Sequence, residues 1–124
     1  MQNITTYSFK SSCIIHINST QNNTILTATD LHGQVLKTSS VGSALKSKRG
    51  KRSVPQGALL SGEILGSFLV DKGFETSQVR IKGFGIGREK AIQGLFSSGL
   101  QIVTILDITK VPHNGCRPRK IRRI

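Results

Sequence analysis

The sequence predicts an α/β fold: a mixed five-stranded sheet with two helices, a basic loop and an extended basic C-terminal tail. Three observations support this class. Short β-branched or alternating runs separated by turn-forming residues fill the first third of the chain, which is typical of an antiparallel meander. A strand, a helix and a strand follow in the second half, which implies a parallel crossover. At 124 residues the chain is long enough for one hydrophobic core and too short for two.

The expected antiparallel strands begin with residues 13–18 (CIIHIN), which are rich in β-branched side chains. The turn-forming residues TQNN connect this run to residues 24–30 (TILTATD), where apolar and polar side chains alternate. His32 and Gly33 form a second turn before a third expected strand at residues 35–40 (VLKTSS). These runs predict one half of the sheet.

Two helices are expected in the second half of the chain. The first covers about residues 55–71, because Pro55 suits the first turn of a helix and the Lys72-Gly73 pair suits its end. Its apolar residues recur at helical spacing and are interpreted as a core-facing stripe. They are Leu59, Leu60, Ile64, Phe68 and Leu69. The second helix covers residues 88–98, with Ala91, Ile92, Leu95 and Phe96 on one side.

Two further strands flank the second helix. Residues 78–82 (QVRIK) alternate apolar and polar side chains. Residues 101–106 (QIVTIL) form a continuous apolar run, which favours a strand buried on both faces. The expected division is a short N-terminal segment at 1–11, one α/β domain at 12–109 and a basic tail at 110–124.

The charge of the chain is strongly positive and unevenly distributed. Lysine and arginine number 18 against 6 acidic residues, a formal net charge of +12. No acidic residue occurs between Asp30 and Glu63 or after Asp107, and two basic clusters lie in these acid-free stretches. The loop cluster is Lys46, Lys48, Arg49, Lys51 and Arg52, and the tail cluster is Lys110, Arg117, Arg119, Lys120, Arg122 and Arg123. Such clustering indicates binding to nucleic acid phosphates.

The tail sequence KVPHNGCRPRKIRRI predicts an extended arm. Pro112 and Pro118 exclude a continuous helix, and Asn114-Gly115 is a strong turn pair because both residues tolerate positive φ. A membrane is not an expected partner, since neither basic cluster adjoins an amphipathic helix and no apolar run approaches the ~20 residues of a membrane span.

A glycine-rich turn, GFGIG, lies between an expected strand and the helix that starts at Arg88. Backbone N–H groups in such a turn can approach a phosphate, and the helix N-terminus favours an anion. Asp107 follows the turn at about the spacing of the acidic residue that binds the ribose in dinucleotide-binding proteins, so a dinucleotide site is one alternative. However, Arg88 stands where that fingerprint needs its third glycine, and there is only one crossover. The same turn suits an RNA phosphate, with Arg80, Lys82 and Lys90 nearby.

The sequence predicts no catalytic activity, metal site or cofactor. Its 6 acidic residues form no two-metal motif, and no serine or cysteine lies in a nucleophile motif. His113 and Cys116 have the spacing of metal ligands, but a structural zinc site needs four. Two cysteines suit a reducing compartment. Because tryptophan is absent and aromatic residues are few, phosphate and ribose contacts are expected to supply the affinity.

The C-terminal stretch DITKVPHNGCRPRKIRRI closely resembles the signature of the universal small-subunit ribosomal protein eleven family. IKGFGIGREKAIQGL and IHINSTQNNTILTATDLHG are also similar to segments of that family, so the resemblance covers nearly the whole chain from about Ile14. It implies a ribonuclease H-like topology and a structural role on the platform of the small subunit. The implied partners are small-subunit rRNA, neighbouring platform proteins and, as a further possibility, mRNA near its exit site.

The resemblance also implies which residues face RNA. In the tail they are His113, Asn114, Gly115, Arg117, Arg119, Lys120, Arg122 and Arg123. In the glycine-rich turn they are Lys82, Gly83, Gly85, Gly87 and Arg88, and the basic loop Lys46 to Arg52 matches the family in position and charge.

Several positions depart from the family pattern. The basic N-terminal extension of bacterial members is nearly absent, Phe84 and Ile86 replace prolines of the turn, and Arg119 and Ile121 replace Pro and Lys. These departures favour an organellar ribosome, in the mitochondrial matrix rather than the plastid. The alternatives are an RNA-binding module outside ribosomes and a nucleotide-binding enzyme that uses GFGIG.

Overall fold

The computed structural model describes residues 12–45 and 54–124. The expected N-terminal segment 1–11 and the basic loop at 46–53, with its predicted RNA-facing residues, lie outside the described residues. The strands, in chain order, are β1 (Ser12–Ser19), β2 (Thr24–Thr29), β3 (Val35–Ser40), β4 (Thr76–Lys82) and β5 (Gln101–Asp107). The helices are α2 (Val41–Leu45), α3 (Pro55–Asp71) and α4 (Arg88–Ser97).

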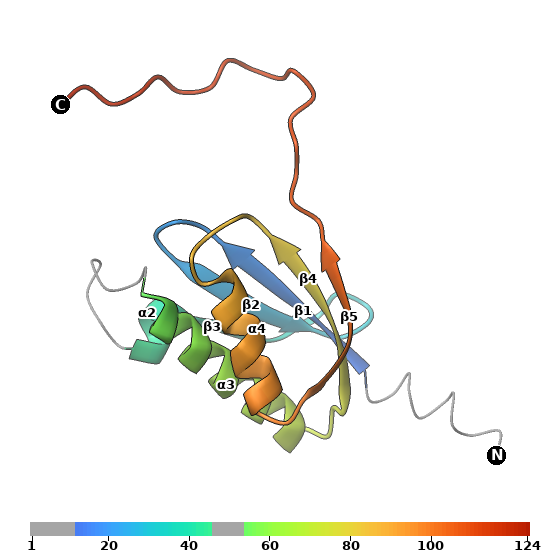
Figure 1. The fold of residues 1–124 in the computed structure, drawn as a ribbon. Helices are drawn as coiled ribbons and strands as arrows, with labels where there is room; N and C mark the ends of the chain where they lie inside the picture. Colours follow the sequence, from blue (N-terminus) through green and yellow to red (C-terminus); the bar gives the residue numbers. More distant parts are fainter. Residues whose placement is uncertain (1–11, 46–53) are drawn as a thin grey trace.

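The five strands form one mixed sheet in the order β3-β2-β1-β4-β5. β1 pairs with β2 and β2 with β3 in antiparallel fashion, whereas β4 pairs parallel to both β1 and β5. This arrangement confirms the predicted α/β class and mixed five-stranded sheet, and it is the ribonuclease H-like topology that the resemblance implies. The helices pack on one face of the sheet (Figure 1).

The core lies between that face and the helices. Alternate residues of the central strands, such as Ile15, Ile17 and Val79, meet Leu65 of α3 and Leu95 of α4, and all five side chains are fully buried. Alternation along the strands places every second side chain on this face. None of the described helices combines the length and the apolar character needed to cross a membrane.

The short helix α2 was not predicted. Its five residues form a single turn that includes a glycine, which is too short to show helical periodicity in the sequence. Two contacts stabilise this turn. The hydroxyl of Ser40 accepts a hydrogen bond from the Ser43 N–H (3.3 Å), as an N-cap does, and Val41 is buried against Gly57 of α3.

The buried face of α3 is not the one that the apolar spacing predicted. Ala58, Ser61 and Leu65 are fully buried although the spacing did not include them, and of the expected core residues only Leu69 is fully buried. Leu60 is 37% exposed, Ile64 is 38% exposed, and Phe68 is only partly buried. The reason is the α3–α4 contact, which requires small residues and therefore selects the glycine-bearing side of the helix.

β5 is also more exposed than predicted. Val103, Ile105 and Leu106 are 66%, 48% and 40% exposed, although a strand buried on both faces was expected. β5 is an edge strand that pairs only with β4. The main strand contacts of α4 are with β1 and β2, so β5 has little helical cover. Likewise, Phe96 in α4 is 57% exposed instead of facing the core.

We predict that Gly94→Ala in α4 destabilises the fold. A Cβ at this position would collide with the carbonyl oxygen of Leu59 and lie 3.0 Å from the backbone nitrogen of Glu63. Overpacking of this kind costs about 1–3 kcal/mol, which outweighs the helix propensity of about 1 kcal/mol gained with alanine. The measurement is urea unfolding followed by circular dichroism. The matched control is Gln93→Ala, an exposed position expected to stay within about 0.5 kcal/mol. Increased stability of Gly94→Ala would contradict the prediction.

Candidate RNA-binding surface

The glycine-rich turn and the tail leave the sheet side by side. β4 ends at Lys82 and leads into the turn, and its parallel neighbour β5 ends at Asp107 and leads into the tail. The Ile108 N–H donates a hydrogen bond to the Ile81 carbonyl oxygen (2.8 Å), which extends the pairing past the end of β5. Because parallel strands share their carboxyl ends, two predicted segments that are 19 residues apart in sequence meet at one end of the sheet (Figure 1).

The side chain of Asp107 connects these two segments. One carboxylate oxygen accepts bonds from the Thr109 hydroxyl (2.6 Å) and the Thr109 N–H (3.0 Å). The other oxygen accepts a bond from Arg88 at the start of α4 (2.8 Å), which is also an ion pair. The Thr109 hydroxyl in turn accepts the Gly83 N–H (3.1 Å), and Arg88 donates to the Gly83 carbonyl oxygen (3.2 Å). The base of the tail is thus fastened to the turn.

This network determines the ionisation of Asp107. Hydrogen bonds from the hydroxyl and N–H of Thr109, and then the bond from Arg88, lower the pKa of Asp107 from its ordinary value of 3.8 to about 2. The carboxylate is therefore charged at neutral pH and already occupied. It serves the fold, whereas the dinucleotide alternative needs it for a ribose.

The glycines of the turn allow close packing within the chain. A Cβ on Gly83, where φ is +93°, would collide with the Ser19 carbonyl oxygen. A Cβ on Gly85 would collide with the Thr20 carbonyl oxygen, and one on Gly87 would lie 2.7 Å from Ala58 of α3. The turn therefore packs against the β1–β2 hairpin and the first turn of α3. These contacts explain the glycines without a ligand, and RNA contact by their backbone stays a prediction.

Two apolar side chains at the tip of the turn were not identified from the sequence. Phe84 is 77% exposed and Ile86 is 60% exposed, and with Arg88 and Glu89 they line a shallow hollow of about 390 Å³. The Arg88 guanidinium lies 5.3 Å from the centre of the Phe84 ring. An exposed aromatic ring beside a guanidinium can stack on an unpaired base. The sequence could have indicated their exposure, because side chains in a glycine-rich turn are seldom buried.

The face of the sheet opposite the helices carries further cations. Arg80 and Lys82 alternate with the buried residues of β4, so their side chains lie on this face, as does that of His16 in β1. The Nε of Arg80 is buried without a hydrogen-bond partner among the described residues. Burial and the nearby charge of Arg80 lower the pKa of His16, so the imidazole is neutral at pH 7. Arg80 is therefore the main charge at the centre of this face.

The tail is extended and fully exposed from Lys110 to Ile124. Asn114 has a φ of +61°, which confirms the predicted bend at Asn114-Gly115. No hydrogen bond or ion pair joins residues 110–124 to the rest of the described chain. Its cations are Lys110, Arg117, Arg119, Lys120, Arg122 and Arg123, and all are free to meet an external anion. His113 and Cys116 are exposed in the same arm.

The predicted residues of the basic loop are outside the described chain, but its flanks are not. Leu45 ends α2 and packs against Gly57, and Val54 is the N-cap residue of α3. Ala58, in the first turn of α3, lies against Gly87 of the glycine-rich turn. The downstream flank of the loop therefore lies beside the turn.

The described residues contain no group of three or more His, Cys, Asp or Glu side chains that could hold a metal ion. Cys13 is buried in the core, and burial raises the pKa of its thiol to about 11. Both Cys13 and Cys116 are free cysteines. The Cys13 thiol is therefore protonated and inert at neutral pH.

Comparison with known proteins identifies the family of this chain and a relative of similar length. The family model described as ribosomal protein S11 matches residues 13–123. The small ribosomal subunit protein uS11c of Tupiella akineta is 48% identical over 111 residues, which cover 90% of this chain and 85% of that protein. Both matches span the sheet, the glycine-rich turn and the tail.

We predict that Asp107→Asn loosens the base of the tail at every pH. In the unchanged chain, the lowered pKa means that the contribution of Asp107 is fully present above its ordinary value of 3.8 and is lost as the pH falls through about 2. The amide signals of Gly83 and Thr109 in ¹H–¹⁵N spectra should therefore hold steady from pH 7 to about 4 and shift below it. Asp71→Asn, an exposed change on α3, is the matched control. If the amide signals of Gly83 and Thr109 in the unchanged chain shifted near pH 6, Asp107 would not be the group that holds the base of the tail.

Proposed function

The chain belongs to the ribosomal protein S11 family, and we propose that it binds small-subunit rRNA through the surface built at the carboxyl ends of β4 and β5. As a member of this family it is a structural constituent of the small ribosomal subunit and not an enzyme. Membership excludes the nucleotide-binding enzyme that the GFGIG turn suggested. It also accounts for the strong positive charge, since rRNA binding is implied by the family.

The observation that carries this proposal is the anchored tail. The network of Asp107, Thr109 and Arg88 holds the base of a free cationic arm against the glycine-rich turn. An arm with a fixed base loses less orientational freedom on binding than one that leaves the domain at random. It can therefore follow a phosphate backbone while the turn and the hairpin meet the RNA at a fixed position.

The proposed RNA-facing residues have different tasks. Lys82 and the tail cations supply charge, because no described acidic group pairs with them. The other residues of the turn shape the surface. The Arg88 side chain is bonded to Asp107. The space beside the Cα atoms of Gly83, Gly85 and Gly87 is filled by other atoms of the chain. In the tail the proposed set is His113, Asn114, Gly115, Arg117, Arg119, Lys120, Arg122 and Arg123. In the basic loop it is Lys46, Lys48, Arg49, Lys51 and Arg52.

We further propose a position on the platform of the small subunit, near the mRNA exit region and beside other platform proteins. The resemblance of the tail and turn to the family supports this position. For the compartment we propose an organellar ribosome. The preference for the mitochondrion came from sequence departures alone, whereas similarity to the plastid protein uS11c supports the plastid.

We predict that replacing Arg117, Arg119, Arg122 and Arg123 with alanine weakens binding to a small-subunit rRNA fragment. Each lost phosphate contact should flatten the slope of log affinity against log salt by roughly 0.7–0.9, or up to about 3.6 if all four arginines contact phosphate. Filter binding across a salt series measures both quantities. Lys37→Ala with Lys72→Ala is the control, because these cations lie beside α3, away from the tail. An unchanged slope in the tail variant would show that the tail does not contact phosphate.

Sedimentation tests the ribosomal and compartment proposals together. Lysates of purified plastids and of purified mitochondria are run on sucrose gradients at high and low magnesium and probed for this chain. We expect comigration with the small subunit of plastids at high magnesium and its loss when low magnesium disrupts the particle. Comigration in the mitochondrial sample would reverse the choice of compartment. Residence at the top of every gradient would favour an RNA-binding module outside ribosomes.

A further inference from the structure

We infer that a groove between α3 and β3 docks a basic, aliphatic segment of a neighbouring small-subunit protein. This inference rests on the proposed place of the chain beside other proteins of the subunit. The groove has a volume of about 500 Å³ and is open to solvent. Its lining residues, which define the α3 groove, are Lys37, Leu60, Glu63, Ile64, Ser67, Phe68 and Asp71.

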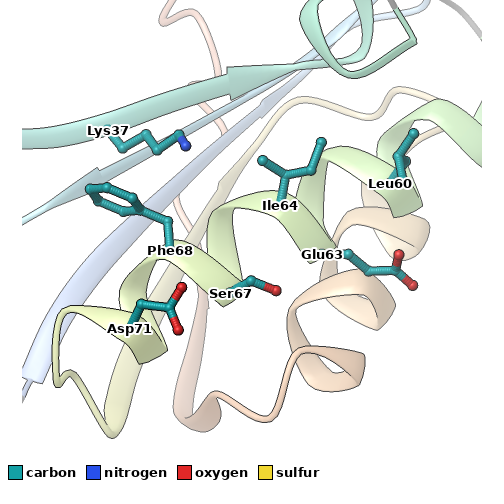
Figure 2. Close-up of a pocket in the computed structure, with 7 residues that line it drawn as sticks. All are labelled: Lys37, Leu60, Glu63, Ile64, Ser67, Phe68 and Asp71. Carbon is teal, nitrogen blue, oxygen red and sulfur yellow. The ribbon is translucent and has the colours of Figure 1, made fainter.

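The α3 groove is built from two parallel rows on one helix (Figure 2). Leu60, Ile64 and Phe68 recur every four residues and form an apolar row on the side of β3. Glu63, Ser67 and Asp71 recur at the same interval and form a polar row beside it. Each row follows the helix at a slight incline to its axis, and a helix or an extended peptide laid across it can follow such a row.

The apolar row is only partly covered by the described chain. α3 uses its opposite, glycine-bearing side to pack on α4, which leaves Leu60 and Ile64 more than one-third exposed. Lys37 of β3 stands over one edge of the row, with its amine 4.6 Å from the centre of the Phe68 ring. A regular row of aliphatic side chains beside an aromatic ring differs from scattered surface residues, and it is typical of an interaction surface.

The polar row indicates the charge of the occupant. Glu63 and Asp71 are two of only 6 acidic residues in a chain of net charge +12. Neither makes an ion pair with any residue that the structure describes, where Arg88 with Asp107 is the only pair. The lining thus holds two carboxylates against the one amine of Lys37. A lysine or arginine of a partner would find these two carboxylates free, so a cationic segment is favoured over phosphate.

Two other occupants fit less well. A second copy placed by twofold symmetry would bring the same acidic row against itself, which is repulsive. The chain's own tail leaves the sheet beside β5, and β3 is the opposite edge (Figure 1). A separate basic protein could cover the apolar row with aliphatic side chains and pair its cations with the polar row. Basic proteins are the usual neighbours in an RNA-rich particle.

The spacing of the carboxylates specifies the partner further. Glu63 and Asp71 are eight residues apart, which is about 12 Å along a helix axis. A partner helix with two basic residues eight positions apart, and aliphatic residues at four-residue spacing on the adjoining stripe, would match both rows. The inference is therefore restricted to a short basic amphipathic segment.

Site-specific photo-crosslinking tests this inference in assembled small subunits. A benzophenone amino acid replaces Ser67 in the α3 groove or, as a matched control, the exposed Ser97 on α4. We expect irradiation at position 67, and not at 97, to yield one cross-linked peptide that is basic and aliphatic and comes from another small-subunit protein. A cross-link from position 67 to rRNA, to this chain or to a second copy would overturn the inference. So would the absence of any cross-link in particles that contain the chain.

A charge variant supplies the second measurement. Glu63→Gln should release the cross-linked neighbour from washed particles at lower salt, with about a 1.5- to 5-fold loss of affinity, as expected for one exposed ion pair. Glu75→Gln, the same change outside the groove, should leave its retention unchanged. Equal retention in both variants would contradict the charge argument. The rRNA and this chain are quantified in the same particles, because loss of the chain itself from the subunit would fault the proposed function instead.

Discussion

The functional end of the molecule depends on one carboxylate. Asp107 ends β5, accepts two hydrogen bonds from Thr109 and pairs with Arg88 at the start of α4. Through these contacts the edge strand, the last helix and the glycine-rich turn hold one another, and the tail departs from a fixed point. The hydrogen bonds also keep the carboxylate ionised far below neutral pH. Without a charged oxygen at this position, the two segments that we propose to face RNA would lose the contact that joins Thr109 to Arg88.

Glycine positions decide how the helices meet the sheet and each other. Gly62 and Gly94 let the backbones of α3 and α4 approach until an added Cβ at either position would collide with the other helix. Gly83, Gly85 and Gly87 do the same between the turn, the hairpin and α3. The atoms that an added Cβ would meet all belong to this chain, so these glycines are explained by internal packing. The glycine-rich turn is therefore first a structural joint, and the RNA contact that we propose for its backbone would depend on that joint.

The molecule separates its charges by location. The cations of the tail stand free at the carboxyl ends of the strands, whereas Glu63 and Asp71 stand free on α3 beside an apolar row. An anionic polymer and a cationic protein segment would thus be attracted to different parts of one small domain. This separation suits a constituent of a ribonucleoprotein particle, where a protein has to contact RNA on one side and other basic proteins on another.

The sequence by itself determined the class of fold, the order of the strands along the chain, the bounds of α3 and the cationic arm with its bend at Asn114. These features follow from local periodicity, turn residues and charge, which neighbours in the chain set. It did not reveal which face of α3 is buried, because Leu60, Ile64 and Phe68 satisfy the same spacing as the true core residues. Nor did it reveal that β5 is an exposed edge, or that Asp107 joins the turn to the tail. Those outcomes depend on which backbone comes close to which, and only the tertiary structure decided them: α4 packs on the glycines of α3, lies over β1 and β2, and brings Arg88 to Asp107.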